Sequence, residues 1–280
     1  MKPFIKWVGG KTQLVPELLN YVPPNFISNT QRTYFEPFLG GGAFLLALLW
    51  RYPASFKAVA SDINGQLINC WNQIQCNLDK LVAELEQATY PEVNERQYYS
   101  IRGLDYSQFS WAFQAARFIV LNKCCFNGLY RENSKGIFNS PWCHKVKTRD
   151  QIFNAEQLQE LSEALIDHCM FNHNTYEQSV ITAVSGDFVY FDPPYHPVST
   201  TANFTAYNKS GFGTKDQERL HDVAKSLAAS GVSVMLSNSD CEFIRNLYKD
   251  LNIHFVQATR RINSDANGRG KVGELLITSY

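Results

Sequence analysis

The chain has 280 residues, 45% of them hydrophobic, which fits one or two globular domains, and no apolar run reaches the ~18 residues of a membrane-spanning helix. Its seven cysteines form no Cys-x-x-Cys pair and its N-terminus has no apolar secretion signal, so we expect reduced thiols in a cytoplasmic protein without a metal site. The net charge of +0 argues against a nucleic-acid binder, but residues 117–149 carry seven basic side chains against one acidic side chain.

The first part of the chain predicts a strand, a glycine-rich turn and a helix, in that order. An extended apolar stretch ends at Glu36, three glycines (Gly40–Gly42) follow, and a helix is expected over Ala43–Trp50. This order is typical of dinucleotide-binding domains, in which an acid ~20 residues further on binds ribose hydroxyls. Asp62 supplies that acid at the end of the next expected strand. The glycines do not form a Gly-x-Gly-x-x-Gly motif, so phosphate binding is not implied, and a turn that needs small residues is the alternative.

The middle of the chain predicts helices followed by a hairpin. Apolar residues at spacings of three and four predict helices over Leu67–Cys76, Asp79–Gln87 and Trp111–Leu121, and Tyr90-Pro91 ends the second of them. Turn-forming pairs such as Asn-Gly and Ser-Pro then predict a loop and hairpin over residues 122–142.

The last part of the chain returns to alternating helices and strands, which indicates an α/β fold. We therefore expect a larger, discontinuous domain (residues 1–65 and 151–280) interrupted by an inserted domain (residues 66–150). The elements expected in the C-terminal part are the helices Ala155–Leu165 and Asp216–Ala229, the strands Phe188–Phe191 and Val232–Leu236, and a strand pair, Ile253–Ala258 with Glu274–Tyr280.

The strand over residues 188–191 ends in Asp192-Pro193-Pro194-Tyr195. The two prolines stiffen this turn, because proline fixes φ, has no N–H and restricts the residue before it. The Asp192 carboxylate and the carbonyls of Asp192 and Pro193 stay available as acceptors beside the Tyr195 ring. Such a group suits a flat ring with an exocyclic amine, since the oxygens accept its N–H groups and the ring stacks on its face. An ordinary strand end with an Asp-Pro turn is the alternative.

Four motifs together resemble the DNA adenine methyltransferase (Dam) family. They are Lys-Trp-Val-Gly-Gly-Lys at residues 6–11, Phe-Glu-Pro-Phe-Leu-Gly-Gly-Gly at 35–42, Asp-Ile-Asn at 62–64 and Asp-Pro-Pro-Tyr at 192–195. Residues 121–142 are similar to the family's target-recognition hairpin, and residues 201–207 to its mobile substrate loop. The resemblance implies methylation of the exocyclic amine of adenine in duplex DNA. It also implies a Rossmann-like mixed methyltransferase sheet with a last antiparallel strand, and a mostly helical inserted target-recognition domain with its hairpin.

The resemblance also implies roles for individual residues. The catalytic group is Asp192, Pro193, Pro194 and Tyr195. The cofactor, S-adenosylmethionine, leaves as S-adenosylhomocysteine, and its expected contacts are Trp7, Lys11, Phe38, Gly40, Gly42, Asp62 and Asp192. The expected DNA contacts are Lys6, Asn127, Leu129, Arg131 and Pro141, with Arg131 reading guanine in a GATC site.

Three further expectations come from the residues alone. Tyr176 is a candidate to flank the adenine of the cofactor, with a surface turn as the competing interpretation. Trp7, taken alone, is more typical of a core residue. Basic side chains are expected to contact phosphate, which positions the protein without specifying a sequence; they are Lys145, Lys147, Arg149, Arg260 and Arg261.

The expected partner is double-stranded DNA, with no membrane. A monomer is the default for the family, and a restriction endonuclease acting on the same site is a further partner that the resemblance allows. Alternatives are the same chemistry at another DNA site, on RNA adenine or on glutamine, a non-catalytic nucleic-acid-binding regulator, and a nicotinamide-dependent oxidoreductase. The intact Asp192, Gly40–Gly42 and Asp62 argue against the regulator, and no Tyr-x-x-x-Lys signature supports the oxidoreductase.

Overall fold

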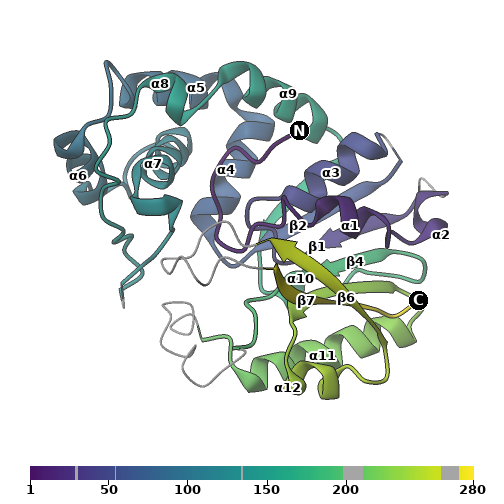
Figure 1. Ribbon diagram of the computed structural model, residues 1–280. Coiled ribbons are helices and arrows are strands. Elements are labelled where there is room, and N and C mark those ends of the chain that lie inside the picture. The colour runs from purple at the N-terminus through teal and green to yellow at the C-terminus, as the bar shows by residue number, and fades with distance from the viewer. Residues whose placement is uncertain (29–30, 54, 134, 198–210, 260–270) are drawn as a thin grey trace. The chain divides into compact units, whose positions relative to one another are not determined.

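The computed structural model describes residues 1–28, 31–53, 55–133, 135–197, 211–259 and 271–280 (Figure 1). These residues form two compact units. The first unit consists of Met1–Gly10, Gly40–Arg51 and Asp62–His173, and the second of Lys11–Leu39, Tyr52–Ser61 and Asn174–Tyr280. Within the described ranges, no helix is long and apolar enough to span a membrane.

Within the described residues, seven strands form one mixed sheet in the order β3-β2-β1-β4-β5-β7-β6. Strands β2, β1, β4 and β5 are parallel, and β7 runs antiparallel to both β5 and β6. This arrangement confirms the predicted α/β sheet with a last antiparallel strand. The strands are β1 (Thr33–Glu36), β2 (Lys57–Asp62), β3 (Cys169–His173), β4 (Phe188–Phe191), β5 (Ser233–Ser239), β6 (Asn252–Thr259) and β7 (Lys271–Thr278).

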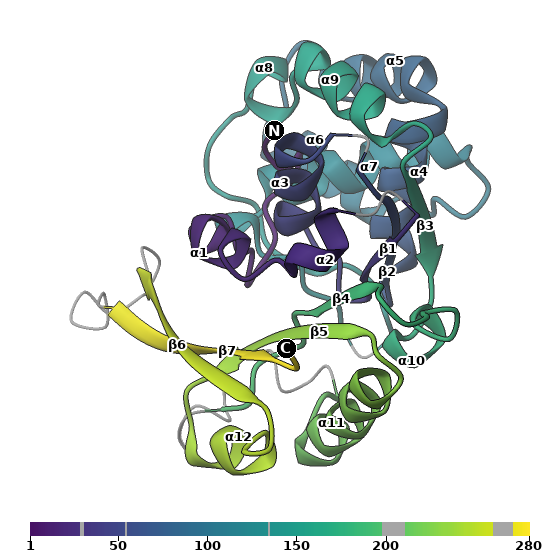
Figure 2. The same cartoon turned by 90° about the vertical axis from the view of Figure 1, so that its right-hand side faces the viewer.

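In the second unit, helices cover both faces of the central strands. All four residues of β4 are buried, as expected for a parallel strand with a continuous apolar sequence. On one face, Leu220 and Ile244 pack with Val189 and Val234 in the core. On the other face, Phe26 packs against the rings of β1 and β4. Figure 2 shows α11 and α12 on one side of β5 and β7, and α1 and α2 on the other. The helices of this unit are α1 (Val15–Leu19), α2 (Pro24–Ile27), α10 (Tyr176–Ser179), α11 (Thr214–Ala229) and α12 (Glu242–Leu247).

The first unit is mostly helical and is organised around one buried helix, α7 (Trp111–Cys124). Ten of its fourteen residues are buried, because α4, α5, α6 and α8 all pack against it. Ser110 caps its N-terminus by accepting the Phe113 N–H, 3.1 Å away. The other helices are α3 (Ala43–Arg51), α4 (Gly65–Cys76), α5 (Leu78–Ala88), α6 (Glu95–Gly103), α8 (Arg149–Ile152) and α9 (Ala155–Leu165), with a short 3₁₀ turn, η1 (Phe126–Gly128).

The structure confirms each helix and strand expected from periodicity, with ends that differ by a few residues, and adds several that periodicity does not predict. The clearest addition is α6, in which only Tyr98 is buried, so the helix has almost no apolar periodicity. Its sequence signal is instead the capping box of Asn94 and Gln97, each of whose side chains binds the other's backbone N–H. The further additions are η1, α8, α10, α12 and β3.

Candidate functional site

The turn at residues 192–195, here called the catalytic turn, follows β4 directly and lies in the second unit. The Asp192 carboxylate, 18% exposed, forms an ion pair with the Lys11 ammonium, whose Nζ lies 2.9 Å from Asp192 Oδ1. Lys11 is 8% exposed, and its Nζ also lies 4.4 Å from the centroid of the Tyr195 ring. The Tyr195 hydroxyl donates a hydrogen bond of 2.7 Å to Glu274 Oε2. The structure therefore gathers four of these side chains into one chain of contacts, Asp192–Lys11–Tyr195–Glu274.

Polar side chains from two neighbouring elements hold the backbone of the catalytic turn. Gln217 of α11 donates to the Pro194 carbonyl at 2.8 Å and accepts from the Asn238 amide at 3.0 Å. Asn238 of β5 accepts the His196 N–H at 3.1 Å. Gln217 and Asn238 are both fully buried, so these bonds are protected from water and make the turn rigid.

Two acceptors of the catalytic turn have no donor among the described residues. They are the Pro193 carbonyl and Asp192 Oδ2. Burial raises the pKa of the Asp192 carboxyl to about 6, with Lys11 opposing the shift and Glu274 adding to it. At neutral pH the carboxylate is therefore ionised, and this end of β4 presents two oxygen acceptors beside an aromatic ring.

An aromatic pair, Phe38 and Tyr176, lies in the same unit. The two rings stack with their centroids 5.4 Å apart and their planes at 22°. Tyr176 is 8% exposed at the start of α10, and it packs edge-on against Phe191 of β4. The competing interpretation of Tyr176 as a surface residue in a turn is therefore wrong, because the ring is part of the core around β4.

The three glycines Gly40–Gly42, here called the glycine turn, lie in the first unit and require glycine at two positions. Gly40 and Gly42 have φ of +49° and +65°, which other residues rarely adopt. A Cβ at Gly40 would also lie 2.6 Å from the Trp7 ring. Both Asp62 carboxylate oxygens accept a backbone N–H at 2.9 Å, one from Gly40 and one from Asn64. Burial raises the pKa of the Asp62 carboxyl, and these hydrogen bonds lower it.

The N-terminal segment of the first unit is attached to α7 through a buried amide. Asn122, fully buried, accepts the Lys6 backbone N–H at 3.0 Å and donates to the Lys6 carbonyl at 2.8 Å. A Cβ at Gly128, whose φ is +65°, would lie 2.7 Å from the Lys6 side chain. The Trp7 ring stacks on Tyr130 with centroids 5.5 Å apart. Trp7 thus contacts both the glycine turn and the segment that follows α7.

Residues 127–141, here called the hairpin, bring together four of the residues expected to contact DNA. The strands of the hairpin are joined by the Glu132–Phe138 bridge and by the bond from Asn139 N–H to the Arg131 carbonyl at 2.9 Å. Asn127, Arg131 and Pro141 are exposed, and Leu129 is half-buried. The Arg131 Nε donates to Asn139 Oδ1 at 2.9 Å, which directs the guanidinium while leaving its two terminal amino groups free of partners among the described residues.

Replacing Asn122 with alanine is expected to destabilise the first unit. The change leaves the Lys6 N–H and C=O without their buried partner, and a lost partner costs about 1–3 kcal/mol of unfolding free energy. Urea denaturation of Asn122→Ala and of a surface variant, Asn25→Ala, measures the effect. An unfolding free energy of Asn122→Ala equal to that of Asn25→Ala would show that the amide does not hold the segment.

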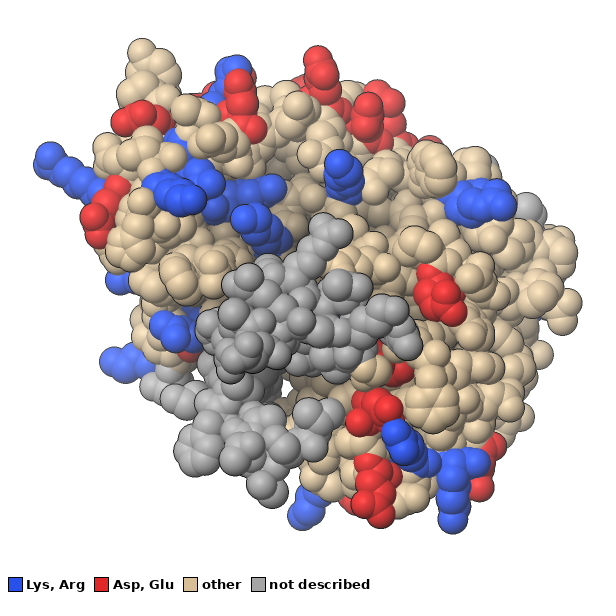
Figure 3. All heavy atoms as spheres, viewed as in Figure 1, with Lys and Arg blue, Asp and Glu red and all other residues tan. Residues whose placement is uncertain are grey.

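The basic residues between 117 and 149 do not form one surface. Arg117, counted above among them, is 3% exposed, because it donates to the Ile101 and Arg102 carbonyls and lies over the Tyr106 ring. It is therefore a structural residue and not a phosphate contact. Lys145 is exposed and Lys147 half-buried. On the face of the molecule drawn in Figure 3, basic side chains gather over the part that belongs to the first unit. Arg260, Arg261 and residues 201–207 lie outside the described residues.

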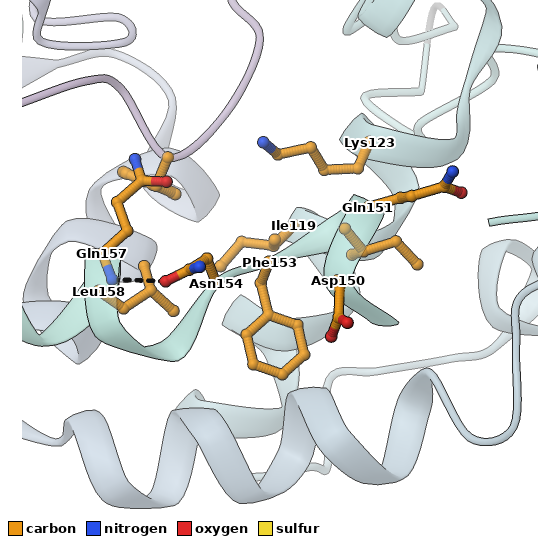
Figure 4. Close-up of a pocket in the computed structure, with 10 residues that line it drawn as sticks. Ile119, Lys123, Asp150, Gln151, Phe153, Asn154, Gln157 and Leu158 are labelled. Atoms are coloured by element: carbon orange, nitrogen blue, oxygen red, sulfur yellow. Dashed lines mark hydrogen bonds between the residues drawn. The ribbon is translucent and has the colours of Figure 1, made fainter. Parts of the chain in front are cut away.

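A small pocket of the first unit contains none of the expected site residues. Lys123, Asn154 and Phe153 line it, and Asn154 accepts the Gln157 backbone N–H at 2.7 Å beside it (Figure 4). Its volume of about 80 Å³ is well below that of pockets that hold cofactor-sized ligands, roughly 300–1,000 Å³. The pocket does not suit a nucleotide or S-adenosylmethionine.

Comparison with known proteins identifies the family. The model of the "D12 class N6 adenine-specific DNA methyltransferase" family matches residues 7–262. The chain belongs to this family. Its relatives include "Type II methyltransferase M1.LlaDCHI" of Lactococcus lactis subsp. cremoris, 39% identical over 100% of this chain and 96% of the relative. Others are "Type II methyltransferase M.MjaIII" of Methanocaldococcus jannaschii, 36% identical over 100% and 99%, and "DNA adenine methylase" of Vibrio cholerae serotype O1, 35% identical over 98% and 95%.

Membership of the D12 class decides between the functional classes considered above. The protein is an adenine-specific DNA methyltransferase, so the regulator and oxidoreductase interpretations are excluded. The family implies S-adenosylmethionine as the methyl donor and DNA as the substrate. The described residues of each unit suit contacts with that cofactor. In the first unit, Gly40 has a positive φ, lies against Trp7 and donates its N–H to Asp62. In the second unit, Phe38 and Tyr176 present stacked rings.

Reasoning from sequence missed several residues that hold the site together, among them Asn238, Glu274 and Asn122. Asn238 had a usable signal, since Ser237-Asn238-Ser239 is a polar run at the carboxyl end of a buried parallel strand, where α/β sheets bind ligands. Glu274 and Asn122 had no such sequence signal, because each binds a residue far away in the chain. Glu274 binds Tyr195, 79 positions away, and Asn122 binds Lys6, 116 positions away.

Proposed function

We propose that this methyltransferase transfers the methyl group of S-adenosylmethionine directly to the exocyclic amine of an adenine flipped out of duplex DNA, within the sequence GATC. The observation that carries the proposal is the catalytic turn, in which an ionised Asp192 and the free Pro193 carbonyl lie beside the Tyr195 ring. A base inside a duplex cannot reach such a turn, so it must be extruded.

The catalytic turn activates the amine by positioning and electrostatics. The lone pair of the adenine amine is delocalised into the ring, which makes the amine a poor nucleophile. Asp192 Oδ2 and the Pro193 carbonyl accept its two N–H groups and localise that lone pair towards the methyl group. Tyr195 stacks on the base, and Pro194 keeps the turn rigid through its bond from Gln217. No covalent intermediate with the enzyme is needed.

The bound cofactor supplies a methyl group on a sulfonium ion, and the chain supplies its binding groups. The Asp62 oxygens have lone pairs left for the ribose hydroxyls after their two backbone bonds. Gly40 and Gly42 permit close backbone approach. The remaining contacts that we propose are Trp7, Lys11, Phe38, Tyr176 and Asp192, with Tyr176 beside the adenine of the cofactor.

The hairpin supports the proposed GATC specificity. Arg131 presents a guanidinium that can bond bidentately to guanine in the major groove. Lys6, Asn127, Leu129 and Pro141 complete the proposed base-reading group, and the structure places Lys6 against Gly128 within the hairpin. Phosphate contacts are proposed for Lys145, Lys147, Arg149, Arg260 and Arg261.

Two parts of the chain have different proposed roles. Residues 1–65 and 151–280 carry out the chemistry, and residues 66–150 recognise the target. We propose that the enzyme acts in the cytoplasm as a monomer, either alone or beside a restriction endonuclease that cuts the same site. The name "Type II methyltransferase" of two relatives supports the second arrangement.

The rate of methyl transfer is expected to fall in acid because the Asp192 carboxylate must be ionised to accept the amine. Its pKa of about 6 lies above the ordinary value of 3.8. The single-turnover rate should therefore be full near pH 8 and decline about tenfold per pH unit as the pH falls below 6. A rate that stays constant down to pH 5 would contradict an ionised Asp192 as the acceptor.

The identity of the methyl acceptor is tested by offering the enzyme three candidate substrates. Protein and labelled S-adenosylmethionine are incubated with a GATC-containing DNA duplex, an RNA duplex of the same sequence and a glutamine-containing peptide. Digestion of the products to nucleosides and amino acids then locates the label. We expect label only in N6-methyldeoxyadenosine, and label in the RNA or the peptide would overturn the restriction to DNA adenine.

A further inference from the structure

Glu274 makes a contact with the catalytic turn that the chemistry above does not use. It lies on β7, opposite Ser239 of β5 in the antiparallel register. Its Oε2 accepts the hydrogen bond from the Tyr195 hydroxyl at 2.7 Å, and both side chains are partly buried. Among the described residues, the Glu274 side chain makes no other hydrogen bond or ion pair. The Glu274 carboxylate therefore binds the Tyr195 side chain, whose ring we propose to stack on the target base.

We infer that Glu274 is a positioning residue for methyl transfer, which orients the Tyr195 ring through its hydroxyl and balances the charge of Lys11 beside Asp192. The inference rests on the proposed function of the catalytic turn. It adds a residue from the last antiparallel strand, β7, to a site whose catalytic turn follows the parallel strand β4.

The geometry explains why the ring needs such an anchor. A tyrosine ring can swing about two side-chain torsions, and backbone rigidity at the prolines does not restrict them. The Lys11 ammonium lies over one ring face, 4.4 Å from the centroid, and Glu274 holds the hydroxyl at the far end of the ring. The second face meets no other ring or cation among the described residues. The ring is thus held at its hydroxyl and over one face, so little torsional freedom remains to be lost when a base stacks on the other face.

The charges around the turn give Glu274 a second, measurable effect. Lys11, which precedes α1, lowers the pKa of the Asp192 carboxyl, and Glu274 on β7 raises it. Tyr190 of β4 and Tyr34 and Glu36 of β1 complete the titratable cluster around Asp192. Removing the Glu274 charge alone should therefore lower the pKa of Asp192 and move the acid limb of the rate to lower pH. A residue that only stabilised the β6–β7 pair would not have this effect.

Three single variants separate the two effects of Glu274. Glu274→Gln keeps an acceptor for the Tyr195 hydroxyl but removes the charge, whereas Glu274→Ala removes both. Tyr195→Phe keeps the ring but removes the hydroxyl. The double variant of Glu274→Ala with Tyr195→Phe tests whether the two side chains act together, and Glu218→Ala, an exposed glutamate of α11, is the matched control. Single-turnover transfer to a GATC duplex at saturating cofactor is measured from pH 5 to pH 9.

We expect Glu274→Ala and Tyr195→Phe each to lower the rate on the order of 10- to 100-fold, as misplaced reacting groups do. The double variant should be no slower than the slower single variant, because both changes break the same bond. Glu274→Gln should keep most of the rate at pH 8 and shift its acid limb to lower pH. Lys11→Met should shift the limb to higher pH.

Additive losses in the double variant, or an unshifted acid limb in Glu274→Gln, would overturn the inference. Circular dichroism and cofactor binding establish that each variant is folded, and the pH profile of Glu274→Gln decides the matter if Glu274→Ala does not fold. Failure of the proposed function can be distinguished from failure of this inference. A wild-type protein that transfers no label to DNA adenine would refute the proposed function before any variant is compared.

Discussion

Asp192→Ala abolishes methyl transfer in our account, and it is the change with the largest expected effect. The variant removes the ionised acceptor of the amine and the partner of Lys11, 2.9 Å away. Loss of one preorganised group at the reacting centre costs roughly 10²–10³-fold in rate, and loss of a charged one at least as much. The single-turnover rate at saturating cofactor measures this loss without a contribution from slow product release.

Two controls isolate the chemical effect of Asp192. Asp192→Asn keeps the size of the side chain and one oxygen but loses the charge, so we expect it to be nearly as slow as Asp192→Ala and to lack the acid limb near pH 6. Asp222→Ala, at an exposed aspartate of α11, should transfer at the wild-type rate. Thermal denaturation establishes that the variants are folded. Substantial methylation by folded Asp192→Ala would remove Asp192 from the catalytic group.

Arg131→Ala relaxes the choice of DNA sequence, and it is the change with the second-largest expected effect. The Arg131 side chain is exposed on the hairpin, and its Nε bond to Asn139 leaves both terminal amino groups to bond guanine. A bidentate contact of this kind discriminates against the wrong base by about 1–3 kcal/mol, which is roughly 5- to 150-fold in affinity or rate. Transfer rates to a panel of duplexes with single base changes in GATC measure the discrimination at each position.

Lys145→Ala is the matched control, since it also removes one exposed positive charge near the hairpin. A phosphate contact weakens binding to every sequence alike, so this variant should lower the rate on all duplexes without changing their ranking. Arg131→Lys should relax specificity almost as much as Arg131→Ala, because an ammonium cannot make the paired bonds. Equal loss of discrimination in Arg131→Ala and Lys145→Ala would refute base reading by Arg131.

The sheet and the catalytic turn could be predicted from sequence because their signals are local. The apolar run 188–191 ends in a charged residue and two prolines, and the structure makes it a fully buried parallel strand followed by a rigid turn. The glycine turn was expected from three adjacent glycines, and two of them have positive φ. In each case one short segment determines its own backbone.

The contacts that complete the site could not be predicted because they join distant segments. Lys11 was expected to bind the cofactor, and nothing in its neighbourhood indicates that its ammonium lies against Asp192 and Tyr195. The sequence around Tyr176 favours a surface turn, since it is tertiary packing on rings such as Phe38 and Phe191 that buries the side chain. Arg117 belongs to a basic stretch of the sequence, but tertiary contacts with the Ile101 and Arg102 carbonyls and the Tyr106 ring bury it. Periodicity shows which face of an element is apolar, but not which polar groups meet across the fold.

Methyl transfer from labelled S-adenosylmethionine to two DNA duplexes, one containing GATC and one containing GTTC in its place, tests the central claim most directly. We predict label in the first duplex alone, recovered as N6-methyladenine. Label in both duplexes would contradict the specificity that we propose for the hairpin while retaining the chemistry. An absence of label from both, with the cofactor still bound, would contradict the proposed reaction at this site.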